Sequence, residues 1–89
     1  MAKRRVIKKQ ADKNRDIIAV CNHMEIWSPK LKKDVIYDIE NNIHTYYVEI
    51  DEKEIDIVVE NESGRKHLIT DPKQTSTNKL LDLPDCSVN

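Results

Sequence analysis

The strongest constraint in this sequence is the two-residue periodicity of its second half. In the segments HTYYVEID (44–51) and EIDIVVE (54–60), apolar residues alternate with mostly polar positions. Successive side chains of a strand point to opposite faces, so this alternation predicts two strands with one buried face. Residues 51–53 suit a tight turn between them, and Gly64, the only glycine, suits a second turn with a positive φ. With KHLIT (66–70) as a third strand, the pattern predicts an antiparallel meander.

An amphipathic helix is predicted before this meander. Ser28 is a favoured N-cap, and Pro29 suits the first helical position, where a missing N–H costs nothing. Apolar residues then recur at helical spacing: Leu31, Val35, Ile36, Ile39 and Ile43. A helix with one apolar stripe must bury it, so we expect this helix to cover one face of a sheet.

Two short strands are predicted upstream of the helix. The β-branched run DIIAVC (16–21) favours a pleated surface, and Val6 with Ile7 indicates a shorter first strand. Together the elements predict an α+β fold. It has a mostly antiparallel sheet of about five short strands in the order β-β-α-β-β-β, one main helix on one face and a short C-terminal helical turn. We expect residues 16–89 to form this single domain and residues 1–15 to be a basic arm or an edge strand.

The C-terminal segment NKLLDLPDC carries three of the five leucines. A domain of 89 residues has a small core and rarely leaves three leucines in water. We therefore expect Leu80, Leu81 and Leu83 to pack across the sheet beside the helix, after a turn capped by Asn78 or Thr77. The alternative is that this segment docks in a groove of a partner.

Charge is balanced overall but graded along the chain. Fifteen basic residues against 16 acidic ones give a net charge of −1, which excludes an argument from net charge for polyanion binding. Basic residues crowd the first fifteen positions, whereas carboxylates crowd residues 49–62. Both segments suit solvated faces, with a functional basic patch as the alternative for the first.

From Asp16 onward, the segments DIIAV, DVIYDIE, HTYYVEI, IDIVVE, KHLITD and NKLLDLPDC form one pattern. It resembles a small family of bacterial proteins described only as a domain of unknown function, number thirty-eight ninety-two in that series. The most specific parts are YYV (46–48), the strand that ends at Thr70 and the close at residues 78–86. His67 departs from the pattern, in which a tyrosine is expected. The resemblance implies a small stand-alone domain without an assigned activity, cofactor or catalytic residue.

Two cysteines, Cys21 and Cys86, are too few for a secreted disulfide scaffold. No apolar run has the length of a signal peptide or of a membrane span. We therefore expect a cytoplasmic protein without membrane contact, with both thiols reduced rather than joined. Cys21, His23 and Cys86, with His44 or His67, lack the paired spacings of a structural zinc site, so we expect no metal and no cofactor.

No nucleophile has a base at a recognisable spacing, so we do not expect an enzyme. The predicted function is a small intracellular binding or accessory module, whose partner is another protein or a second copy of this chain. Its candidate partner or ligand surface comprises Trp27, Tyr47, His23 and His44. The alternative is a nucleic-acid-associated protein whose basic arm neutralises phosphates. The arm residues in question are Lys3, Arg4, Arg5, Lys8 and Lys9.

Overall fold

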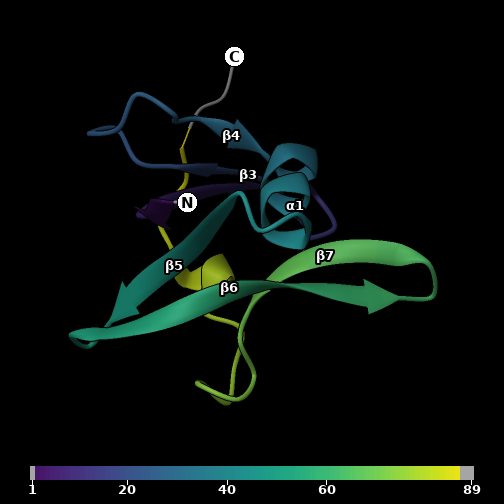
Figure 1. Ribbon diagram of the computed structural model, residues 1–89. Helices are drawn as coiled ribbons and strands as arrows, with labels where there is room; N and C mark the ends of the chain where they lie inside the picture. Colours follow the sequence, from purple (N-terminus) through teal and green to yellow (C-terminus); the bar gives the residue numbers. More distant parts are fainter. Residues whose placement is uncertain (1, 87–89) are drawn as a thin grey trace.

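The computed structural model describes residues 2–86 and has the predicted α+β fold (Figure 1). Residues 1 and 87–89, at the ends of the two expected ranges, lie outside the described residues. The elements are β1 (Ala2–Arg5), β2 (Lys8–Ala11), β3 (Ile17–Cys21), β4 (Lys30–Leu31), α1 (Lys32–Glu40), β5 (His44–Ile50), β6 (Lys53–Glu62), β7 (Arg65–Thr70) and the 3-10 turn η1 (Leu80–Asp82).

Residues 2–86 contain seven strands in two sheets, where about five strands in one sheet were expected. The strand orders are β1-β5-β6-β7 and β2-β3-β4. The β1–β5 pairing is parallel and the others are antiparallel. The chain passes between the sheets where Val6 N donates to Tyr47 O at 2.8 Å and Ile7 N donates to Cys21 O at 3.0 Å. The basic N-terminal segment therefore supplies one strand to each sheet.

The meander of β5, β6 and β7 is confirmed. Alternate side chains are buried, as the periodicity predicts: Tyr46, Val48, Ile55, Ile57 and Leu68. Asp51 and Glu52 form the first turn with φ of 52° and 65°, and Gly64 lies in the second with φ of 81°. Both turns need the left-handed region, which suits the twist of a tight hairpin.

The start of the helix differs from the prediction. Ser28 and Pro29 are not its N-cap and first residue, because Lys30 and Leu31 stay extended as β4 and pair with β3. The hydroxyl of Ser28 instead accepts a hydrogen bond from the backbone N–H of Asn22 at 2.8 Å. Figure 1 shows the consequence, a short helix that begins beside β3 and β4 and contacts strands of both sheets.

The apolar stripe of the helix is narrower than predicted. Val35 is fully buried in the core, and Ile36 and Ile39 pack against the core from partly buried positions. Leu31 is 45% exposed and Ile43 is also exposed, because they lie outside the two ends of α1. The helical period therefore holds only over residues 32–40.

The C-terminal leucines belong to the core, as predicted. Leu80 opens η1 and is fully buried, while Leu81 and Leu83 pack against the core cluster. Asn78 organises this turn, since its Oδ1 accepts hydrogen bonds from Leu80 N at 3.1 Å and from Thr70 N at 3.3 Å. The segment is thus part of the fold rather than a free docking tail.

Candidate functional site

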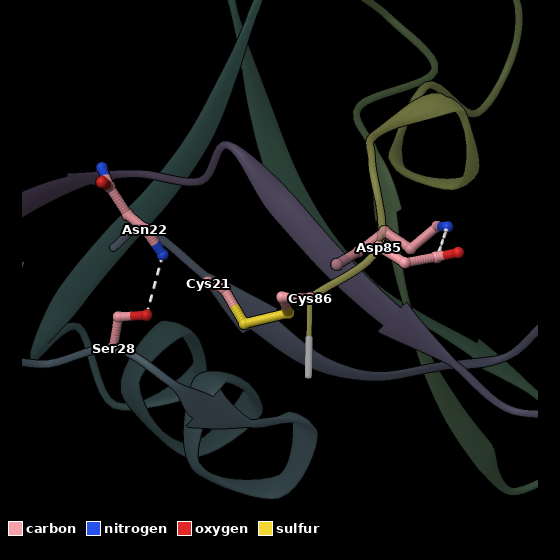
Figure 2. Close-up of a disulfide and its surroundings, with 6 residues drawn as sticks. Cys21, Asn22, Ser28, Asp85 and Cys86 are labelled. Carbon is pink, nitrogen blue, oxygen red and sulfur yellow. Dashed lines mark hydrogen bonds and ion pairs between the residues drawn. A yellow bond between two sulfur atoms is a disulfide. The ribbon is translucent and has the colours of Figure 1, made fainter. Parts of the chain in front are cut away.

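The loop between β3 and β4 (residues 22–29, the β3–β4 loop) has an ordered backbone. Asn22 is buried; its Oδ1 accepts from Met24 N at 3.1 Å and its Nδ2 donates to Arg5 O at 3.0 Å. Its backbone N–H donates to Ser28 Oγ, a bond visible in Figure 2 that ties the two ends of the loop together. Glu25 N donates to Asn22 O at 2.9 Å. Side-chain and backbone hydrogen bonds thus tie Asn22 to Met24, Glu25 and Ser28 of the same loop.

The side chains of this loop divide between the core and the solvent. Trp27 turns inward: its ring meets that of Tyr46 edge-to-face at 5.8 Å, and the guanidinium of Arg4 lies 5.4 Å from its centroid. Ile26, by contrast, is fully exposed, and Met24 is 68% exposed. An anchored loop therefore presents two large apolar side chains to solvent.

Arg4 belongs to a largely buried polar network. Its Nη1 donates to the hydroxyl of Tyr46 at 2.9 Å, and that hydroxyl donates to Asp38 at 2.6 Å. The guanidinium also lies 3.7 Å from the Asp38 carboxylate and 3.1 Å from Nε2 of His44. Burial, together with the hydrogen bond to Asp38, raises the pKa of Tyr46 to about 12. Because the network joins β1, β5 and α1, its charges support the fold.

Most basic residues of the predicted arm are neutralised by carboxylates. The pairs are Lys3–Glu54, Arg4–Asp38, Arg5–Glu49 and Lys9–Asp85. Lys8 alone among the five arm residues makes no ion pair with a carboxylate of residues 2–86. Of the two alternatives, a basic arm or an edge strand, the described residues form strands, since these side chains lie on β1 and β2 beside acidic neighbours. Side-chain cations that are already paired with carboxylates bind the phosphates of a nucleic acid more weakly than unpaired ones.

Cys21 and Cys86 form a disulfide, which corrects the expectation of two reduced thiols (Figure 2). Their Cα atoms are 6.5 Å apart. The C-terminal segment runs beside β2, where Lys9 N donates to Pro84 O at 2.9 Å and Cys86 N donates to Lys9 O at 2.8 Å. This pairing brings Cys86 next to the end of β3, a proximity that no local spacing in the sequence reveals.

An open pocket of about 320 Å³ lies against this disulfide. Both cysteines line it, together with Lys8, His23 and Asp85. The lining residues come from β2, β3, the β3–β4 loop and the C-terminal segment. Of the groups that they carry, the disulfide is the one that accepts electrons, when a thiolate reaches one of its sulfur atoms.

A second pocket, of about 200 Å³, contains a histidine–carboxylate pair. Nδ1 of His67 lies 2.9 Å from one oxygen of Asp16, and Lys32 donates to the other at 2.9 Å. Partial burial pushes the pKa of Asp16 upward, but the hydrogen bonds from His67 and Lys32 outweigh it and hold that pKa below its ordinary value. No serine, threonine or cysteine is among the described residues that line this pocket.

Of the four residues predicted as one surface, Trp27 and His44 share a neighbour, since both lie beside the guanidinium of Arg4. Trp27 packs on the core, and His44 lies beside Arg4. His23 lines the disulfide pocket instead. Tyr47 is half-buried on β5, where the ammonium of Lys3 lies 5.0 Å from the centroid of its ring.

Sequence reasoning missed Met24 and Ile26, which are the most exposed large apolar residues of the described chain. Nothing in the sequence signalled their exposure, because Met24 and Ile26 alternate with His23 and Glu25 and so have the two-residue period of a half-buried strand.

Comparison with known proteins found no match to this chain among protein-family models, curated proteins or solved structures. The resemblance to a bacterial family therefore stays a prediction. Within residues 2–86, no helix is long and apolar enough to cross a membrane. In the same residues, no three His, Cys, Asp or Glu side chains gather in a way that would hold a metal ion.

Proposed function

We propose that this chain is a non-catalytic binding module that docks a protein partner through Met24 and Ile26 of the β3–β4 loop. One observation carries the proposal: Ile26 is fully exposed on a loop whose backbone is held by hydrogen bonds at both ends. Exposed apolar side chains cost solubility, so two of them on one ordered loop favour a site that is covered by a partner.

Pre-ordering supports a role in binding. A flexible loop loses conformational entropy when it docks, whereas this loop is already held by Asn22, Ser28 and the inward-facing Trp27. The side chains beside the apolar pair, His23 and Glu25, are exposed and polar. An apolar centre with a polar rim is the usual anatomy of a protein interface.

The partner that fits is a protein with a small apolar pocket that accepts a branched aliphatic side chain and a thioether. The same test would also reveal whether the partner is a second copy of this chain. A nucleic-acid role gains no support from the arm, because four of its five cations face carboxylates. A cytoplasmic location is part of this proposal, and disulfides there are usually transient or redox-sensing.

The test places a photo-crosslinking amino acid at Met24 and, as a matched control, at Tyr37, which is exposed on α1. We expect one discrete adduct from position 24 in extracts of the source cells and none from position 37. With the purified partner, Ile26→Ser should weaken binding about ten- to a hundredfold, because one buried aliphatic side chain is lost. Tyr37→Ser should leave the affinity unchanged. Equal affinity of Ile26→Ser and the unmodified protein would contradict the proposal.

A further inference from the structure

Lys8 lies directly opposite Cys21 in the register of β2 and β3. Directly paired residues of antiparallel strands project from the same face, with Cβ atoms about 5 Å apart. Both residues line the pocket over the disulfide, as does His23. Lys8, which makes no ion pair with a carboxylate of residues 2–86, therefore stands beside Cys21.

We propose that the Cys21–Cys86 disulfide is a thiol–disulfide exchange site that reacts with small, carboxylate-bearing thiols. A sulfur atom undergoes exchange only where an incoming thiolate reaches it. The pocket provides this access, and it is large enough at about 320 Å³ for part of a small peptide thiol. The ammonium of Lys8 attracts an anionic thiol, while the one carboxylate residue in the lining, Asp85, is already paired with Lys9.

The accessible sulfur is that of Cys86. Cys21 is only 6% exposed, whereas Cys86 is partly exposed. The incoming thiolate attacks Sγ of Cys86 and forms a new S–S bond, while the bond between Cys86 and Cys21 breaks. Its electron pair remains on Sγ of Cys21 as a thiolate, which Lys8 stabilises because a nearby cation favours the charged form.

A second small thiol completes the exchange. Its thiolate attacks the small-molecule sulfur of the mixed disulfide, which releases a small-molecule disulfide and leaves Cys86 as a thiolate. Two small thiols are thereby oxidised and the protein disulfide is reduced. The two protons lost by the small thiols are taken up by Cys21 and Cys86 or by the solvent.

The fold keeps the two cysteines close in the reduced state. The backbone bonds from Cys86 N to Lys9 O and from Lys9 N to Pro84 O do not involve sulfur. They hold the C-terminal segment beside β2, so the reverse reaction with a small-molecule disulfide restores the bond. The site is therefore reversible. It shares His23 with the rim of the surface proposed for docking through the β3–β4 loop.

The first experiment measures the rate at which glutathione reduces the folded protein at neutral pH. The protein thiols that form are trapped with an alkylating reagent, and the products are identified by their mass. We expect Lys8→Gln to slow the reaction about three- to tenfold, since it removes both the attraction and the stabilised leaving group. Lys13→Gln, which removes an exposed cation in the β2–β3 turn, is the matched control and should react at the original rate. Added salt should slow the unmodified protein toward the rate of Lys8→Gln.

A second measurement does not depend on a variant that folds. In the reduced, unmodified protein, the alkylation rate of Cys21 is followed against pH with a small neutral reagent. We expect half-maximal reactivity below the ordinary thiol pKa of about 8.5. The proposal is overturned if glutathione reduces the protein only in denaturant, if Lys8→Gln and Lys13→Gln react alike, or if Cys21 titrates at or above that value.

Discussion

Cys21 and Cys86 are separated by 65 positions in the sequence, yet a disulfide joins them across Cα atoms 6.5 Å apart. The bond connects the end of β3 to the segment that follows η1. It therefore closes most of the domain into one covalent loop, and the stability of the fold depends on its redox state.

Removing the disulfide should destabilise the protein substantially. In the chain-entropy model, a cross-link that closes a loop of this length raises the free energy of the unfolded chain by about 4 kcal/mol, because it lowers the conformational entropy of that chain. We expect the double variant Cys21→Ser/Cys86→Ser to lose up to about 4 kcal/mol in the free energy of unfolding, measured with urea. The unmodified protein in dithiothreitol is the control and should lose a similar amount. Losses below about 1 kcal/mol in both samples would contradict this prediction.

Tyr46→Phe should destabilise the fold through its polar network. The variant removes the hydroxyl that donates to Asp38 and accepts from Arg4, and it leaves a buried carboxylate without that donor. We expect a loss of about 1–3 kcal/mol in the free energy of unfolding, measured with urea. Tyr37→Phe alters an exposed ring and serves as the control. Equal stability of the two variants would show that the network adds nothing.

The hydroxyl of Tyr46 should ionise at a pH above its ordinary pKa of 10.0. Its pKa is raised from 10.0 to about 12 in the folded state, so the folded protein favours the neutral hydroxyl. This contribution to stability is fully present below pH 10 and is lost as the pH rises toward 12. Tyrosinate absorbance, followed beside circular dichroism, should show one late step that is missing in Tyr46→Phe. A single shared transition near pH 10 in folded protein would refute the prediction.

Asp16 should make stability depend on acid pH. Its pKa lies below the ordinary 3.8, so the carboxylate stabilises the fold above that pH and the contribution disappears as the pH falls through the lower folded value. We expect Asp16→Asn to be less stable than the unmodified protein at neutral pH, and the difference to shrink as the pH falls below 3.8. Thermal unfolding across this range measures the difference. Glu62→Gln, at the exposed tip of the β6–β7 hairpin, should show no such convergence.

Leu80→Ala tests the role of the C-terminal turn in the core. Leu80 is fully buried, so its truncation should cost about 2–5 kcal/mol. Leu83→Ala is the comparison, because Leu83 is only partly buried and should cost clearly less. Urea unfolding of both variants gives the two values. Equal small losses in the free energy of unfolding of the two variants would favour the alternative, in which the segment is a peripheral docking tail.

Much of the fold was determined by the sequence itself. The alternation in residues 44–60, the stripe around Val35 and the leucines of η1 each show which side chains must be buried. Such patterns show which face of a helix or strand is buried, because the direction of each side chain follows from the period of that element. They correctly predicted the meander, the single helix, the C-terminal turn and the α+β class.

The candidate sites, in contrast, were decided by the tertiary structure. Lys30 and Leu31 stay extended because β3 offers them an edge. The basic segment is neutralised because α1, β5, β6 and the C-terminal segment bring carboxylates beside it. Lys8 meets Cys21, and Cys21 meets Cys86, only through strand pairing between distant segments. The periodicity of a single segment does not show which distant strand it will pair with or in what register. That pairing is fixed only when the whole chain folds.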